Sequence, residues 1–117
     1  MPENKNWFDL LVNQTEDITT APIFAQILDM GIYIYGNFDG AQVKIQVSPD
    51  DVHNTDLYPG GPDEAHWFDH DAAVFTDETY INGDFAEVWI RAVQSGSGAG
   101  TDVTLKLRPR VEAVINL

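Results

Sequence analysis

The stretch GNFDGAQVKIQVSPDD (Gly36–Asp51) decides the fold class. Between a glycine-rich turn and the closing Ser-Pro-Asp-Asp, apolar and polar side chains alternate. The apolar ones are Ala41, Val43, Ile45 and Val47, and the polar ones between them are Gln42, Lys44 and Gln46. A period of two residues predicts a β-strand with one buried face.

The same period recurs in four other segments, which are residues 30–36, 85–93, 101–108 and 111–117. In the first, Ile32 and Ile34 share one face. The second is expected to place Ala86, Val88, Ile90 and Ala92 on one face and Phe85, Glu87, Trp89 and Arg91 on the other. In the third, we expect Val103, Leu105 and Leu107 to point inward. Only residues 22–30 hint at a helical turn. The chain is therefore predicted to be an all-β, single-domain antiparallel β-sandwich, either jelly-roll or Ig-like.

The domain organisation is expected to be an extended N-terminal arm, residues 1–20, followed by the sandwich, residues 21–117. Two alternatives stay open for the apolar segment 6–12, because a polar spacer separates it from the rest. It is either a first strand packed on the domain or an arm that docks on a neighbouring subunit. The second alternative predicts that removal of residues 1–12 leaves a folded domain.

The composition limits the function classes. The chain has 117 residues, 44% of them hydrophobic, and no cysteine, which excludes disulfides and thiolate metal sites. Six basic and 19 acidic residues give a net charge of −13. We expect no direct nucleic-acid binding, because this requires clustered lysine and arginine. No secretion signal or membrane-spanning segment is predicted.

Residues 50–78 contain nine acidic residues, all three histidines and no lysine or arginine. One alternative is a transition-metal site of His66 and His70 with Asp69 or Asp71. Another is calcium, with Asp50, Asp51, Asp69 and Asp71 as ligands, and a third is a pair of glycosidase carboxylates. Nine unpaired carboxylates cannot all be buried. We therefore predict a solvated acidic surface with no obligatory metal or cofactor.

Aromatic residues form a second candidate site. Tyr33, Tyr35, Trp67, Tyr80 and Trp89 could form an aromatic face that binds a sugar or a protein. Of these, Tyr33, Tyr35 and Trp89 are expected to lie on faces opposite the aliphatic ones. The sequence contains no G-x-S-x-G, P-loop or G-x-G-x-x-G motif. We therefore predict that the protein is not an enzyme.

The order of these pieces resembles small β-sandwich virion proteins of tailed bacteriophages. The resemblance covers residues 32–107 and is best in "GAQVKIQVSPD" (Gly40–Asp50) and in "IRAVQSGSGAGTDVTLKL" (Ile90–Leu107). It implies a structural protein of the virion. Within that class, we expect a head decoration (cement) protein on the capsid exterior, which stabilises the head against internal DNA pressure. The alternative is a carbohydrate- or receptor-binding module of a tail or head fibre, with Trp67, Trp89 and Tyr80 as stacking platforms.

The resemblance also implies partners. These are the major capsid protein and further copies of the chain, with a trimer favoured, and neither nucleic acid nor membrane is expected. The terminal segments are the expected contacts, because an unpaired strand can complete another sheet. The residues are Trp7, Phe8, Leu10, Leu11, Val12, Val111, Val114, Ile115 and Leu117.

Overall fold

The computed structural model describes residues 8–109, apart from the side chains of residues 26–29, 86, 87 and 109. Seven strands account for most of this range. They are β1 (Phe8–Gln14), β2 (Ile18–Thr19), β3 (Ile23–Asn37), β4 (Gln42–Ser48), β5 (Phe68–Phe75), β6 (Thr79–Ser95) and β7 (Asp102–Pro109). A single turn of 3₁₀-helix, η1 (Pro62–Glu64), interrupts the long connection between β4 and β5. The predicted all-β class is confirmed.

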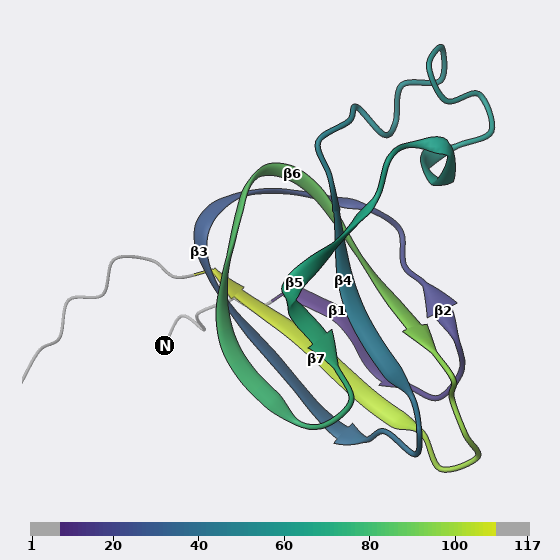
Figure 1. Ribbon diagram of the computed structural model, residues 1–117, viewed down its shortest axis with the longest axis vertical. Helices are drawn as coiled ribbons and strands as arrows, with labels where there is room; N and C mark the ends of the chain where they lie inside the picture. The colour runs from purple at the N-terminus through teal and green to yellow at the C-terminus, as the bar shows by residue number, and fades with distance from the viewer. Residues whose placement is uncertain (1–7, 110–117) are drawn as a thin grey trace, which may run out of the picture.

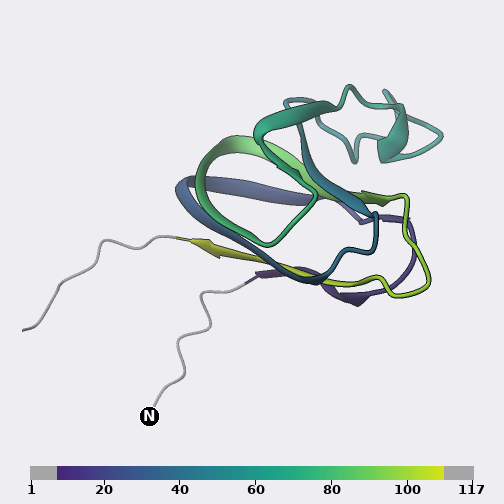
Figure 2. The ribbon, with the colours of Figure 1, turned by 60° about the horizontal axis from the view of Figure 1, so that its bottom comes forward.

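All seven strands belong to one antiparallel sheet with the order β1-β7-β3-β6-β4-β5, and β2 pairs separately with β6. The long strands β3 and β6 bend, so this sheet folds over into two layers (Figures 1 and 2). One layer consists of β1, β7, the end of β3 and the start of β6. The other consists of β2, the start of β3, the end of β6, β4 and β5.

The bent strands give the sandwich its topology. We count each bent strand as two segments, leave the two-residue β2 aside, and number the resulting eight segments along the chain. The layers are then two four-stranded sheets with the segment orders 1-8-3-6 and 2-7-4-5. Two interlocked Greek keys of this kind are a jelly roll. Of the two predicted topologies, the jelly roll is therefore the one that the strand pairing forms.

The core lies between the two layers and is formed by apolar side chains of the segments in which alternation was predicted. Ile32, Ile34, Val43, Ile45, Ile90, Val103, Leu105 and Leu107 are completely buried. Polar neighbours such as Gln42 face outward. The hint of a helical turn in residues 22–30 is wrong, because β3 runs through this segment.

The predicted face of Phe85 is also wrong. Phe85 is completely buried in the core, like Ile90, although residues an odd number of positions apart on a regular strand point to opposite faces. The pairing of β3 with β6 shifts register between Ala25 and Ile27 and again between Ile27 and Met30. A register shift moves the side chains beyond it to the other face of the sheet. The sequence alternation is therefore valid only on one side of this bend.

The described part of the N-terminal segment is a strand of the domain. β1 pairs with β7, with Phe8 opposite Leu107 and Leu11 opposite Leu105. Leu11 is only 2% exposed and belongs to the core. Of the two alternatives for this segment, a strand packed on the domain is the one that the structure shows. Residues 8–19 are therefore not an arm outside the sandwich. The segment before Phe8 lies outside the described residues.

The loops divide between the two ends of the sandwich. At one end, backbone N–H groups of one loop donate to carboxylates of another, as from Ser97 to Asp17 at 2.9 Å and from Gly100 to Asp39 at 2.7 Å. At the other end, the connection between β4 and β5 projects beyond the sheets (Figure 1). We call this connection, residues 49–67, the acidic loop.

Candidate functional site

The acidic loop is folded onto the sandwich. Val52 is 1% exposed and Ala65 is 8% exposed, so both point inward. Asn54 orders the next turn, because its side-chain oxygen accepts the backbone N–H of Asp56 at 3.0 Å and of Leu57 at 3.2 Å. Side chains therefore hold this loop in one conformation, although Pro59, Gly60, Gly61 and Pro62 prevent regular structure.

Asp50 ties the start of the acidic loop to its end. Its Oδ2 accepts the backbone N–H of His66 at 2.8 Å and lies 2.8 Å from the Nδ1 of the same histidine. Tyr58 also donates its hydroxyl to this carboxylate. These bonds, those from His66 first, hold the pKa of Asp50 below its ordinary range. The hydrogen bond to the Asp50 carboxylate raises the pKa of the Tyr58 hydroxyl.

Arg91 of β6 holds the acidic loop against the sandwich. Its guanidinium stacks on the ring of Trp67, 4.1 Å from the ring centroid. It donates from Nη1 to Asp63 at 2.7 Å and from Nε to the side-chain oxygen of Gln46 at 2.9 Å. The Trp67 indole donates to the carbonyl of Pro62 at 2.9 Å. The Trp67 indole is thus hydrogen-bonded within the loop, and the Arg91 guanidinium covers one face of its ring.

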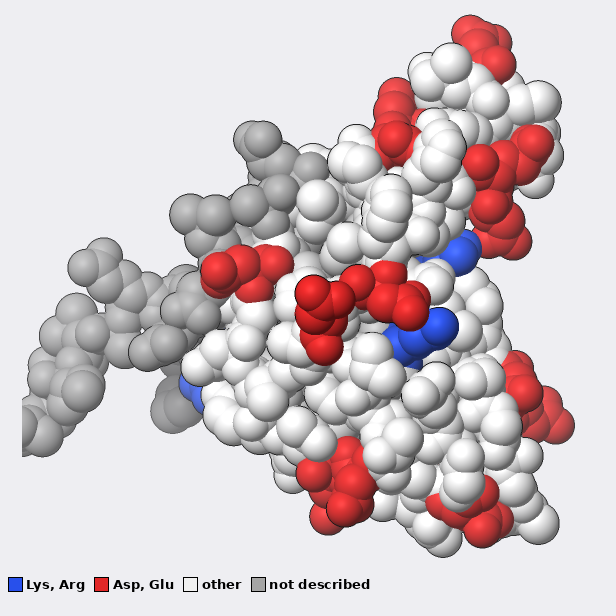
Figure 3. Space-filling view, viewed as in Figure 1, with Lys and Arg blue, Asp and Glu red and all other residues white. Residues whose placement is uncertain are grey.

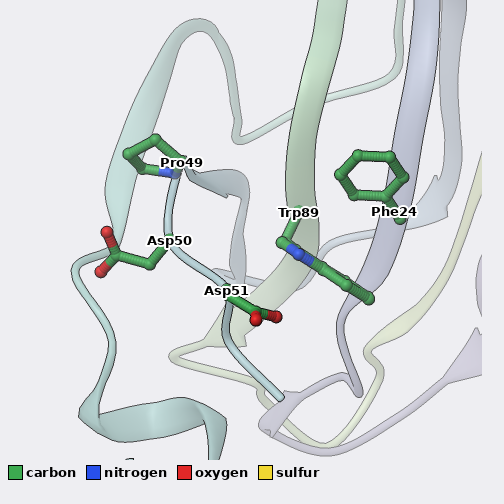
Figure 4. A pocket seen from close by; sticks show the side chains of 5 residues that line it. All are labelled: Phe24, Pro49, Asp50, Asp51 and Trp89. Carbon is green, nitrogen blue, oxygen red and sulfur yellow. The ribbon is translucent and has the colours of Figure 1, made fainter. Parts of the chain in front are cut away.

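A pocket opens where the acidic loop leaves β4. It has a volume of about 450 Å³ and is lined by Phe24, Pro49, Asp50, Asp51 and Trp89. The rings of Phe24 and Trp89 pack with their centroids 5.2 Å apart and their planes tilted by 57°. The Asp51 carboxylate points toward the indole, whereas that of Asp50 points away from it (Figure 4). We call this site the Phe24–Trp89 pocket.

His53 packs on the same indole as Phe24. Its ring meets the Trp89 ring edge-on, with centroids 4.6 Å apart. The acidic loop, β3 and β6 therefore all contribute to the surroundings of Trp89. Sequence reasoning missed Phe24, because its partner Trp89 is 65 positions away and only the strand pairing brings them together.

The three tyrosines of the predicted aromatic face form a separate cluster. Tyr33 lies 4.8 Å from Tyr35 and 6.1 Å from Tyr80, measured between ring centroids. Tyr33 and Tyr80 are 38% and 61% exposed. They occupy the outer face of the sheet that contains β1 and β7. We call Tyr33, Tyr35 and Tyr80 the tyrosine patch.

The structure does not bring the five predicted aromatic residues onto one face. Phe24 pairs with Trp89, and Tyr33 pairs with Tyr80. Along β3, Phe24 lies nine residues before Tyr33, and along β6, Trp89 lies nine residues after Tyr80. At about 3.3 Å per residue, this is roughly 30 Å of strand. The bend between them places Trp89 on the outer face of the other layer. The tyrosine patch and the Phe24–Trp89 pocket are therefore two distinct surfaces.

The proposed metal ligands are dispersed. His66 contacts Asp50, His53 packs on Trp89, and His70 packs on Phe85 with ring centroids 4.9 Å apart. Asp69 accepts hydrogen bonds from Gln46 at 3.0 Å and from Lys44 at 3.3 Å. The bond from Gln46, more than that from Lys44, lowers its pKa. Among the side chains that the structure describes, no three histidine or acidic groups are arranged to hold a metal ion. Acidic residues are instead scattered over the loop and the sandwich (Figure 3).

The expected interface residues differ in where they lie. Phe8 and Val12 on β1 are 48% and 59% exposed, Leu10 is partly buried, and Leu11 is in the core. Leu11 is thus not accessible to a partner in the folded domain. Trp7, Val111, Val114, Ile115 and Leu117 lie outside the described residues.

Comparison of the chain with protein families, curated proteins and solved structures finds no match. Within the described range, no helix has the length and apolar character required to cross a membrane.

Proposed function

We propose that the chain is a structural protein of a tailed-phage particle, and specifically a head decoration (cement) protein. In this proposal it binds the outer surface of the capsid in many copies, contacts the major capsid protein and neighbouring copies, and resists the outward pressure of packed DNA. The oligomer that we favour is a trimer.

The main support is the tyrosine patch. Three aromatic rings on the outer face of a β-sheet, with Tyr33 in contact with both Tyr35 and Tyr80, are an exposed apolar surface. Such surfaces mark sites of association, and tyrosine is enriched in protein interfaces. Phe8 and Val12, on β1 of the same layer, add exposed apolar area.

The strand pairing supports the resemblance, because parts of its two best segments are paired with each other. Its two best segments correspond to β4 and to the end of β6 with β7. β4 and β6 pair continuously from Gln42 opposite Ser95 to Ser48 opposite Trp89. The first segment and the β6 part of the second are thus neighbours in the folded domain, whereas β7 belongs to the other layer. The jelly roll itself occurs in viral capsid proteins and in lectins, so it favours a binding role without selecting one.

Multiple copies explain how such a surface could stabilise a head. A small interface binds weakly, but a bound oligomer engages several sites at once, and the effective concentration of each further contact is high. The net charge of −13 keeps the free protein soluble despite its exposed aromatic residues.

The experiment compares heads with and without the protein. Heads that lack it should release DNA at a lower temperature than complete heads, and added purified protein should restore the higher temperature. Tyr80→Ser should weaken binding to these heads by tenfold or more, because central aromatic residues dominate interfaces. Leu57→Ser is the matched control, since Leu57 is equally exposed at 63% but lies in the acidic loop. Equal DNA release from both kinds of head would overturn the proposal.

The competing carbohydrate-binding function rests on Trp89, which lines an open pocket. A glycan array and the copy number in purified particles separate the two functions. Hundreds of copies favour cement, whereas a handful of copies together with a saturable glycan favour a receptor-binding module.

A further inference from the structure

The Phe24–Trp89 pocket combines two aromatic rings with acidic side chains. Phe24, Pro49 and Trp89 supply its apolar lining, and Asp50 and Asp51 supply the charge. We infer that this pocket binds a basic side chain, lysine or arginine, presented by a partner protein. This inference stands on the pocket alone and does not depend on the virion proposal.

The aromatic rings suit the two parts of such a side chain. An ammonium or guanidinium group is attracted to the face of an aromatic ring, and tryptophan attracts it most strongly. The aliphatic stem of lysine or arginine packs on apolar surface while its charged end stays near water. Phe24, which is 46% exposed, and Pro49 offer that surface beside the indole.

The carboxylates suit the donors of such a side chain. Asp51 is exposed, and its carboxylate points toward the indole (Figure 4). A cation on the ring would therefore lie between a π-face and an anion. The Asp50 carboxylate is already occupied by His66, so Asp51 is the ion-pairing residue.

None of the five lining residues is basic, and the charged and titratable groups beside the pocket have contacts of their own. Arg91, two residues from Trp89 along β6, has its guanidinium bound by Asp63 and Gln46 and stacked on Trp67. His53 contacts the indole edge-on from the acidic loop.

A basic side chain fits this lining better than a sugar does. Carboxylates accept hydrogen bonds, and the indole Nε1–H is the only side-chain donor among the five lining residues. A sugar hydroxyl both donates and accepts, so its recognition uses donors as well as acceptors. Ammonium and guanidinium groups only donate, which matches a lining that mainly accepts.

The test is a titration of the full chain by two-dimensional NMR. The readout is the Trp89 indole N–H signal, identified by its loss in Trp89→Phe. The probes are capped tripeptides Gly-Lys-Gly, Gly-Arg-Gly and Gly-norleucine-Gly, together with glucose and N-acetylglucosamine. We expect the lysine and arginine peptides to shift this signal in a saturable and salt-sensitive way, and the uncharged norleucine peptide and the sugars to leave it unchanged.

Two variants make the test specific. Asp51→Asn should weaken binding of the lysine and arginine peptides about three- to tenfold, the range of one partly solvated charge contact. Asp56→Asn, in the same loop and with the same change of net charge, should leave binding unchanged. Both side chains are exposed, so neither variant should unfold the domain.

Three results would overturn the inference. An equal response to the norleucine peptide would show a merely apolar site, and a response to sugars alone would show a carbohydrate site. Equal weakening by Asp51→Asn and Asp56→Asn would show general attraction by the net charge. Failure of the head-binding experiment would leave this result unaffected, because the tyrosine patch is on the other layer.

Discussion

At the scale of single residues, Asp50 joins the start of the acidic loop to its end. His66 contributes a backbone N–H and a ring nitrogen, each 2.8 Å from the carboxylate, and Tyr58 contributes its hydroxyl. Hydrogen bonds to a charged group are stronger than those to a neutral one. The ionised form of Asp50 therefore stabilises the closed loop, and protonation should weaken it.

The first prediction concerns the pH dependence of Asp50→Asn. The pKa of Asp50 in the folded chain is lower than its ordinary value of 3.8, so the folded chain binds this proton more weakly than the unfolded chain does. Its contribution to stability is complete above the ordinary pKa and is lost as pH falls through the lowered value. Asp50→Asn should therefore lower Tm at pH 7, and the difference from the wild type should shrink below about pH 4.

The control for this prediction is Asp56→Asn, which removes a carboxylate from the same loop. Its Tm should stay close to that of the wild type throughout thermal unfolding from pH 7 to pH 2.5. If both variants lose the same stability at pH 7, the bonds to His66 and Tyr58 are not what stabilises the loop.

At the scale of elements, Arg91 connects the acidic loop to β6. Its side chain is 12% exposed, whereas that of its partner Asp63 is 85% exposed. An exposed ion pair alone contributes little, so the stacking on Trp67 and the bond to Gln46 matter at least as much. The loop should therefore open locally when the guanidinium is removed, even if the sandwich stays folded.

The second prediction is measured by hydrogen exchange of the full chain. Arg91→Met should raise exchange rates of amides in residues 53–66 by about tenfold, which corresponds to roughly 1.4 kcal/mol of local opening free energy. Amides of β7 should change much less. Lys44→Met is the control, because Lys44 pairs with Asp69 on β5 at 3.3 Å and not with the loop. Equal acceleration throughout the chain would mean that Arg91 stabilises the whole domain instead.

The third prediction concerns β1. Leu11→Ala should lower the free energy of unfolding by about 2–5 kcal/mol, because it creates a cavity in the core. Val12→Ala, at the neighbouring exposed position, should change it by less than about 0.5 kcal/mol. Denaturant unfolding measures both. Removal of residues 1–12 should likewise destabilise the domain, contrary to the expectation for a separate arm, and a truncated chain as stable as the full one would contradict the pairing of β1 with β7.

Sequence alternation predicted the elements whose pairing is regular. β4 pairs with β6, and β7 pairs with the end of β3, in one register throughout, so Val43, Ile34 and Leu105 point inward as expected. Alternation failed at Phe85, because a register shift depends on two strands and is not encoded in the period of one. It also could not choose between a strand and an arm for residues 8–14, because partner β7 begins almost 90 residues later.

The candidate sites were harder to predict from the sequence than the fold. Tyr33 and Tyr35 could be placed opposite the aliphatic face from local alternation alone, whereas Tyr80 could not. The Phe24–Trp89 pocket required knowledge of the bend, of the pairing of β3 with β6, and of the path of the acidic loop. Each of these is a long-range property, so composition identified the acidic and aromatic residues but not which of them meet.

At the scale of the whole molecule, charge is the dominant property. The net charge is −13, and acidic side chains are distributed over the visible face rather than gathered at one point (Figure 3). Like charges on a compact domain repel one another and destabilise it, and salt screens this repulsion over about 8 Å at physiological ionic strength. Stability should therefore rise with salt.

The last prediction separates this general effect from a specific calcium site. Raising NaCl from 20 to 200 mM should increase Tm by a few degrees through screening. CaCl₂ at the same ionic strength should give nearly the same Tm, and EDTA should leave the Tm of the purified protein unchanged. The physical reason is that Asp50 and Asp69, two of the four proposed calcium ligands, already accept hydrogen bonds from His66 and from Gln46 and Lys44. A fall in Tm of more than about 4 °C on EDTA addition, equivalent to roughly 1 kcal/mol in a domain of this size, would show that an ion gathers these carboxylates instead.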